Sequence, residues 1–411
     1  MPQNKRKIIN DPVYGFISTS NDFIFDLIEH AWFQRLRRIN QLGLTHLVYP
    51  GALHTRFHHS IGAMYLMQEA LTVLKSKGKT FTEKEQLGAI AAILLHDIGH
   101  GPFSHALEHT LIKNGDHELL SQAIMKRLNE QFDGKLELAI EIFNHKYPKK
   151  YLSQLVSSQL DVDRLDYLTR DSFFTGVSEG VIGTQRIIKM LNVSEDELVV
   201  EKKGIYSIEK FIIARRIMYW QVYLHKTVLS AENMLIKILE RAKFITDNGY
   251  KIFTTPPLHF FLTNTIQKEE FQTNAEIINQ FVLLDDYDIL TSIKLWAYDS
   301  DPVLSSLCSR LINRKLFKCE IQDEPFDYFY IENLKEKIMD NFNISESELR
   351  YFLISDTTSN YAYNIGYDEI FIMSKSGKIT DIEKSSDHLN ISVLSKATIK
   401  HFICYPKDVE N

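Results

Sequence analysis

The chain contains no proline between Lys149 and Thr255. Because proline breaks or kinks the interior of an α-helix, this stretch is open to long, uninterrupted helices. Within it, apolar side chains recur at helical spacing from Ser207 to Asp247, which predicts one or two long helices. Pro256 and Pro257 then mark a break. A helical scaffold is therefore the first expectation for this chain.

Helical patterns also run through most of the first 320 residues. Apolar positions spaced as on one helix face predict helices over Phe33 to Leu42, Ser60 to Lys75 and Thr82 to His96. The last of these opens with Thr82 and Glu85, the spacing of a capping box, and Gly99 follows its end. We therefore predict a mostly α domain over residues 1–320, with a core at about 50–175 and long helices at 205–250 that complete its pocket.

The pattern of apolar and polar residues changes after about Lys318. The segments FKCEI, YFLISD, DEIFIMSKSG and IKHFICYP are short, rich in β-branched and aromatic residues, and joined by polar turns. They predict strands. Residues 321–411 are therefore expected to form a small α+β subdomain at the C-terminal end of a mostly α protein.

Charge and cysteine content narrow the class of protein. The formal net charge is -6 over 411 residues, which argues against general electrostatic binding to nucleic acid. The three cysteines form no CxxC pair, so neither a disulfide framework nor a thiolate zinc site is expected. No apolar run is long enough for a bilayer, and the basic N-terminus lacks the apolar core of a signal peptide. We expect a cytoplasmic protein without membrane contact.

Histidines are concentrated in one region, since eight of the 15 lie between His54 and His117. The segment LLHDIGHGPFSH at 94–105 holds an adjacent His96-Asp97 pair, which offers an imidazole nitrogen and a carboxylate oxygen to one cation. His59 and Asp163, on other predicted helices, are candidates for the remaining ligands. Two imidazoles and two carboxylates suit Fe, Mn, Zn or Ni better than Ca or Mg.

The order His59, His96-Asp97, Asp163 resembles the H…HD…D signature of the HD superfamily. The flanking segments PGALHTRFHHSIG, LLHDIGHGPFSHALE, DVDRLDYLTRD and YLHK resemble its dNTP triphosphohydrolase branch, which includes dGTPase-like enzymes and proteins that join a sterile alpha motif to an HD domain. The similarity runs from about Asn10 to the KLFKC segment, without a sterile alpha motif. It implies an HD-domain helical fold and hydrolysis of a dNTP to deoxynucleoside and triphosphate.

The resemblance also assigns roles to individual residues. It implies that one divalent metal ion is held by four ligands, His59, His96, Asp97 and Asp163. It also implies that Mg²⁺ can accompany the substrate phosphates. His117 matches the catalytic histidine, Glu118 would orient it, and His100 would line the phosphate path. The implied phosphate-binding residues are Arg56, His105, Arg164, Tyr167, Arg215 and Lys226. The implied sugar-binding residues are Gln41 and Asp171 at the 3′-hydroxyl, and Leu42 and Tyr223 at the 2′ position.

A second nucleotide site and self-association are further implications of the resemblance. Regulated members bind an activator nucleotide near positions matched here by Lys7, Gln34 and Arg37, with Glu29 in place of the usual aspartate. Relatives assemble as dimers or tetramers, so a homo-dimer or homo-tetramer is expected. Two interpretations stay open: Arg35, Arg37 and Arg38 can form a solvated helix face, and His100 and His105 can be structural histidines. At Arg164, Tyr219 and Leu224 the chain departs from the usual residues, which leaves base preference open.

Two other functions are compatible with the same residues. One is a different HD phosphohydrolase that acts on ribonucleotides, nucleoside monophosphates or signalling nucleotides. The other is a catalytically silent nucleotide sensor or nucleic-acid binder that keeps the fold. The complete ligand set and the cations around it favour an enzyme.

Overall fold

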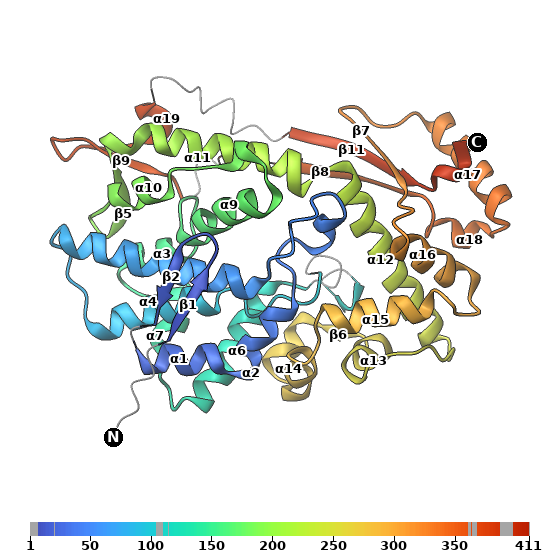
Figure 1. The fold of residues 1–411 in the computed structure, drawn as a ribbon, viewed down its shortest axis with the longest axis horizontal. Coiled ribbons are helices and arrows are strands. Elements are labelled where there is room, and N and C mark those ends of the chain that lie inside the picture. The colour runs from blue at the N-terminus through green and yellow to red at the C-terminus, as the bar shows by residue number, and fades with distance from the viewer. Residues whose placement is uncertain are drawn as a thin grey trace.

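A computed structural model describes residues 7–19, 21–103, 110–113, 115–360, 363, 368–386 and 398–410. Over these residues the molecule consists mainly of helices, with four small sheets (Figure 1). The predicted mostly α fold with a small α+β C-terminal part is confirmed.

The helices of the N-terminal two thirds form the scaffold of the site. Helix α3 packs against both α4 and α9, and α4 also packs against α7. The bounds are α1 (Asp22–Glu29), α2 (Ala31–Gln34), α3 (Arg56–Ser76), α4 (Glu83–Leu95), α6 (His117–Gln131), α7 (Glu137–Phe143), α8 (Lys150–Val156), α9 (Val162–Thr175), α10 (Thr184–Met190), α11 (Ile205–Met218) and α12 (Lys226–Asp247).

Helix α4 begins as the sequence predicts. The Thr82 hydroxyl accepts a hydrogen bond from the Glu85 amide at 3.2 Å, and the Glu85 carboxylate accepts one from the Thr82 amide at 2.6 Å. These two bonds satisfy amide groups that the first helical turn leaves without intrahelical partners. From Gly88 to Leu95 every residue is buried, so this helix lies in the core. Its last turn thus places His96 and Asp97 inside the protein.

Helix α3 starts four residues earlier than predicted, at Arg56. Thr55 is its N-cap, and the Nδ1 atom of His58 accepts a hydrogen bond from the Thr55 amide at 3.1 Å. His58 therefore has a capping function, and His59 follows it on the neighbouring, buried side of the helix.

The predicted helix over Phe33 to Leu42 is wrong in its second half. The α-helical turns end at Gln34, a 3₁₀ turn η1 (Arg35–Arg38) follows, and Ile39 is extended. The backbone there pairs with the segment before α3: the Arg56 amide donates to the Ile39 carbonyl at 2.9 Å. Apolar spacing alone could not show this pairing, because it depends on a segment further along the chain.

The proline-free stretch forms two long helices, as predicted. Between α11 and α12 lies a π-helical turn, η5 (Tyr219–Tyr223), and the extended residue His225 then separates the two helices without proline. Earlier in the stretch, β4 (Leu191–Ser194) and β5 (Glu197–Glu201) form a hairpin that helical periodicity did not indicate.

The chain after Pro256 forms a second group of helices, and the remaining strands come from both before and after this point. The helices are α13 (Pro256–Thr263), α14 (Ala275–Phe281), α15 (Asp286–Trp296), α16 (Pro302–Ile312), α17 (Tyr328–Phe342), α18 (Glu346–Leu349) and α19 (Ile382–Ser385). The other strands are β1 (Ile8–Asp11), β2 (Gly15–Ser18), β3 (Ile112–Lys113), β6 (Ile266–Gln267), β7 (Lys318–Gln322), β8 (Ile354–Asn360), β9 (Phe371–Met373), β10 (Ile379–Asp381) and β11 (Thr398–Tyr405).

Strand pairing crosses the predicted domain boundary at 320/321. One sheet has the order β7-β11-β8, and Figure 1 places it toward the right of the view, beside α12 and α17. The other has the order β10-β9-β5-β4, in which β9 runs parallel to β5. The C-terminal segment thus completes a sheet that begins near residue 191, and the division into two domains stays a prediction.

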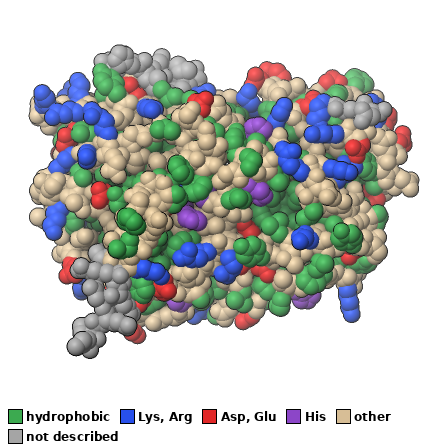
Figure 2. Space-filling model, in the orientation of Figure 1, with side chains coloured by type: hydrophobic (Ala, Val, Ile, Leu, Met, Phe, Trp, Pro, Cys, Tyr) green, Lys and Arg blue, Asp and Glu red, His purple; other side chains and the backbone are tan. Residues whose placement is uncertain are grey.

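The surface carries charges of both signs. On the face shown in Figure 2, Lys and Arg side chains are spread among acidic and hydrophobic ones. Among the described residues, no helix combines the length and the apolar character needed to cross a bilayer.

Candidate metal centre and substrate site

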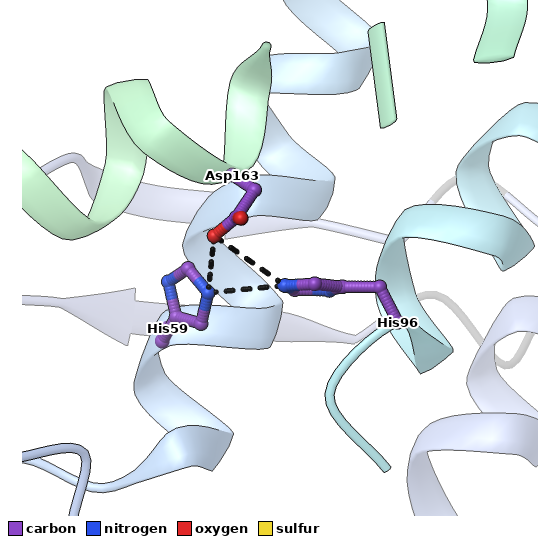
Figure 3. A group of neighbouring side chains, drawn as sticks. All are labelled: His59, His96 and Asp163. Carbon is purple, nitrogen blue, oxygen red and sulfur yellow. Dashed lines mark hydrogen bonds and ion pairs between the residues drawn. The ribbon is translucent and has the colours of Figure 1, made fainter. Parts of the chain in front are cut away.

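Three predicted ligands from three separate helical segments meet at one point (Figure 3). His59 comes from α3, His96 follows the last turn of α4, and Asp163 lies in the first turn of α9. The Nε2 atoms of the two histidines are 3.2 Å apart. Oδ1 of Asp163 lies 3.1 Å from Nε2 of His59 and 3.5 Å from Nε2 of His96. Both imidazoles are buried.

Asp97 lies at the edge of the same cluster. Its Oδ1 atom is 3.4 Å from Nε2 of His96, and its Oδ2 atom is 3.7 Å from Nε2 of His59. Atoms that bind one metal ion at about 2.1 Å lie about 3.0–3.4 Å from each other in octahedral or tetrahedral geometry. The separations of 3.1–3.7 Å between these atoms are close to this size, so the nitrogen and oxygen atoms present fit a single divalent cation.

The orientation of His59 is set by a buried chain of ionic contacts. Its Nδ1 atom lies 2.8 Å from Oδ2 of Asp166, whose carboxylate accepts two hydrogen bonds from Arg170 at 2.9 and 3.0 Å. Arg170 in turn donates to Asp11 at 2.8 Å. A carboxylate on the far nitrogen of a ligand histidine fixes its tautomer and leaves Nε2 free for the metal.

Asp166 and Arg170 are not among the residues predicted to belong to the site. A signal was available, because Asp163, Asp166 and Arg170 are spaced by three and four residues and so share one face of α9. Gly62 on α3 makes room for this pair. A Cβ atom at residue 62 would lie 2.1 Å from both Nη2 of Arg170 and Oδ1 of Asp166.

His96 and Asp97 are also fixed by neighbours. Nδ1 of His96 lies 2.6 Å from the Ile93 carbonyl oxygen, so this nitrogen carries the proton and Nε2 faces the cluster. Arg56 donates to Oδ2 of Asp97 at 2.6 Å. Burial alone would raise the pKa of Asp97, but the electrostatic effect of its neighbours His96, Arg56 and His100 holds this pKa well below its ordinary value. Asp97 is therefore a carboxylate anion, the form that binds a metal ion.

The predicted catalytic histidine, His117, lies beside His100, which was predicted to line the phosphate path. The rings of His100 and His117 are stacked with centroids 4.1 Å apart, and Nε2 of His100 is 3.2 Å from Oδ1 of Asp97. His117 is the first residue of α6, and Glu118 beside it is exposed. The predicted phosphate ligand His105 lies outside the described residues.

Cations and a tyrosine predicted to bind phosphate form a second cluster. Burial raises the pKa of Tyr167, while the nearby positive charges of Arg215 and Arg164 oppose the rise. Arg164 donates to the Ser158 carbonyl at 2.6 Å, whereas Nε of Arg215 is buried and has no hydrogen-bond partner among the described residues. Lys226 is exposed at the start of α12.

Predicted sugar-binding residues form a connected group. The Tyr223 hydroxyl donates to Oδ2 of Asp171 at 2.7 Å. Oε1 of Gln41 is buried and has no hydrogen-bond partner within the described part of the chain. Leu42 is half-buried and packs on the hydrophobic core.

Residues of the predicted activator site pair with one another. Lys7 forms an ion pair with Glu29, and Nε of Arg37 donates to Gln34 at 2.7 Å. The Arg37 guanidinium lies 3.5 Å from the centroid of the Phe57 ring. A nucleotide at this point stays a prediction.

Comparisons with known proteins agree with the geometry. Residues 56–171 match the HD domain and residues 182–250 match the HD associated region. The protein YwfO of Bacillus subtilis is 34% identical over 99% of this chain and 93% of its own length. The crystal structure of a phosphohydrolase from Bacteroides thetaiotaomicron is 52% identical, covers 97% of this chain and 99% of that chain, and superposes with a TM-score of 0.94. The chain belongs to the HD-domain phosphohydrolase family.

Membership of the HD family implies a divalent metal ion, and His59, His96 and Asp163 are arranged to hold one. A more distant HD relative is the deoxynucleoside triphosphate triphosphohydrolase SAMHD1 homolog of Dictyostelium discoideum. It is 34% identical over 56% of this chain, which corresponds to 48% of its own length.

Proposed function

We propose that this HD-domain protein hydrolyses deoxynucleoside triphosphates to a deoxynucleoside and inorganic triphosphate. The observation that most supports the proposal is the convergence of His59, His96 and Asp163 in a buried cluster. The name of the Dictyostelium relative supports the choice of substrate.

The proposed reaction breaks the bond between the α-phosphorus and the 5′-oxygen. The oxygen of a water molecule bonds to phosphorus, and the leaving 5′-oxygen takes a proton. A divalent metal ion, held by His59, His96, Asp97 and Asp163, would supply Lewis-acid polarisation of the phosphate and activate water for the attack. His117, stacked on His100 near Asp97, is our candidate for the proton donor.

The surrounding cations would bind the substrate's triphosphate. Arg164 and Arg215 both lie close enough to Tyr167 to act on its pKa. The buried Nε–H of Arg215 has no partner among the described residues, so a phosphate oxygen would satisfy it. Positive charge placed before the reaction stabilises the anionic transition state without reorganisation.

The test is product analysis with a panel of dNTPs and rNTPs and added Mn²⁺, Fe²⁺, Zn²⁺ or Mg²⁺. Deoxynucleoside plus triphosphate is the expected result. Release of monophosphate or of diphosphate would contradict the bond assignment, and equal turnover of rNTPs would favour the broader phosphohydrolase alternative.

The matched variants are His96→Ala/Asp97→Ala and His259→Ala. The double variant should lose both metal binding and turnover. His259 is exposed on α13, so its variant should keep both. Turnover that survives in the double variant would place the chemistry elsewhere.

A further inference from the structure

His54 is a buried histidine to which the proposed reaction gives no role. It belongs to the histidine-rich region, two residues before Arg56, and its side chain is 0% exposed. Its ring stacks on Phe174, with centroids 4.5 Å apart and an angle of 18° between the planes. The ring is therefore fixed by packing as well as by its polar contacts.

His54 connects the predicted sugar-binding residues. Its Nε2 atom lies 2.8 Å from Oδ1 of Asp171, whose other oxygen accepts the hydrogen bond from Tyr223. Its backbone carbonyl accepts a hydrogen bond from the Gln41 amide at 3.0 Å. One residue thus contacts Asp171 with its ring and Gln41 with its backbone.

The hydrogen-bond pattern shows which nitrogen of His54 carries the proton. Nδ1 is buried and has no hydrogen-bond partner in the described part of the molecule. A proton on Nδ1 would be a buried donor without an acceptor, which is costly. A neutral ring with its proton on Nε2 avoids this cost and donates to Asp171.

Tyr223 is the residue that this arrangement holds in place. Burial and the Asp171 carboxylate raise its pKa well above the ordinary value, so the hydroxyl remains protonated and donates. Its ring packs edge-to-face against Tyr167 and Tyr219, with centroids 6.3 and 5.3 Å away. The Tyr223 ring is therefore constrained at its hydroxyl and by two neighbouring aromatic rings.

We propose that His54 is a positioning residue for sugar selectivity: it orients Asp171, and through Asp171 it fixes Tyr223 against the 2′ position of the nucleotide. The inference rests on the proposed function, in which Gln41, Asp171 and Tyr223 surround the sugar. A side chain that excludes a 2′-hydroxyl group by its bulk must be held rigidly in place. Tyr223 would be free to move without its hydrogen bond to Asp171.

The test compares His54→Gln with His54→Asn. The Gln amide nitrogen can take the place of Nε2 and reach Asp171, whereas the Asn amide is too short. We expect His54→Asn to lower the ratio of kcat/KM for dATP over ATP by about tenfold, the size of a modest steric discrimination. We expect His54→Gln to keep most of the wild-type ratio.

Tyr223→Phe provides the second comparison. It removes the hydrogen bond to Asp171 from the other side and should lower the same ratio. If both residues act through Asp171, combining Tyr223→Phe with His54→Asn should cost little more than the larger single effect. Bound metal and Tm, measured in parallel, separate this effect from general damage.

The result that overturns the proposal is a folded, metal-loaded His54→Asn protein with the wild-type sugar ratio, or Gln and Asn variants that behave alike. If the wild type hydrolyses no dNTP, the proposed function fails. In that case the role of His54 is tested by binding: calorimetric titration gives the ratio of the dissociation constants for dATP and ATP in the wild type and in the His54 variants. A wild type that binds the two equally, or binds neither, also overturns the assignment.

Discussion

Nδ1 of His59 lies 2.8 Å from Oδ2 of Asp166, on the side of the ring opposite the cluster of metal-binding atoms. Asp166→Asn keeps the shape of the side chain but removes its charge. We expect metal affinity to fall about 10- to 100-fold, as is typical when the partner of a ligand histidine is lost. Competition with a chromophoric chelator measures the change. Asp340→Asn, at an exposed residue of α17, should have wild-type affinity.

Gly62→Ala should separate α3 from α9. The added Cβ atom would lie 2.1 Å from atoms of Asp166 and Arg170, which are themselves held in place by ion pairs. We expect unfolding free energy to drop by about 1–3 kcal/mol or more in urea titration, with weaker metal binding. Gly183→Ala is the control, because its nearest neighbour would be an ordinary 3.8 Å away. Equal stability of the two variants would contradict the close packing described for residue 62.

Glu85 should make stability depend on acid pH. Burial opposes its ionisation, but contacts with Lys149, Tyr147 and the Thr82 amide lower its pKa from 4.5 to about 2. A depressed folded-state pKa stabilises the protein above the unfolded value, and this stabilisation is lost as the pH falls from about 4.5 toward 2.

Glu85→Gln should therefore cost about 2 kcal/mol at pH 7, the scale of hydrogen bonds to a charged group, and less near pH 3. Denaturant titrations of the wild type and the variant at both pH values give the difference. Glu83→Gln is the control, because Glu83 is exposed in the same helical turn. A cost that stays constant with pH would show that the lost contacts do not depend on ionisation.

Arg215→Gln should lower kcat/KM for a dNTP, because it removes a cation that would bind the triphosphate. A charged hydrogen bond contributes about 1.5–3 kcal/mol, which corresponds to roughly 10- to 100-fold in kcat/KM for a dNTP. Arg216→Gln is the neighbouring control, because Arg216 donates to Thr398 Oγ1 at 3.3 Å. If both variants retain wild-type kinetics, the buried Nε of Arg215 does not face the phosphates.

The convergence of the metal ligands could be predicted from the sequence, because each ligand lies in a short segment that is recognisable by itself. The His96-Asp97 pair follows a strongly helical, apolar segment, and His59 and Asp163 stand in motifs that resemble those of the HD family. The start of α4 was also predictable, since a capping box needs only Thr82 and Glu85.

Features that depend on distant segments were not predictable in this way. The helix expected after Phe33 ends early because the Ile39 carbonyl pairs with the Arg56 amide. Asp166 looked like one of several acids in α9 until the fold placed it behind His59. His54 was likewise not singled out, because it lies before α3 and its partner Asp171 is 117 residues further along the chain, in α9.

The parallel pairing of β9 (Phe371–Met373) with β5 (Glu197–Glu201) has a consequence for biosynthesis. While the ribosome is still making the segment between them, β5 can pair with β4 but exposes its other edge. This edge is covered only when residue 373 has left the exit tunnel. The nascent chain thus passes through a period in which an open strand must be kept from joining another molecule.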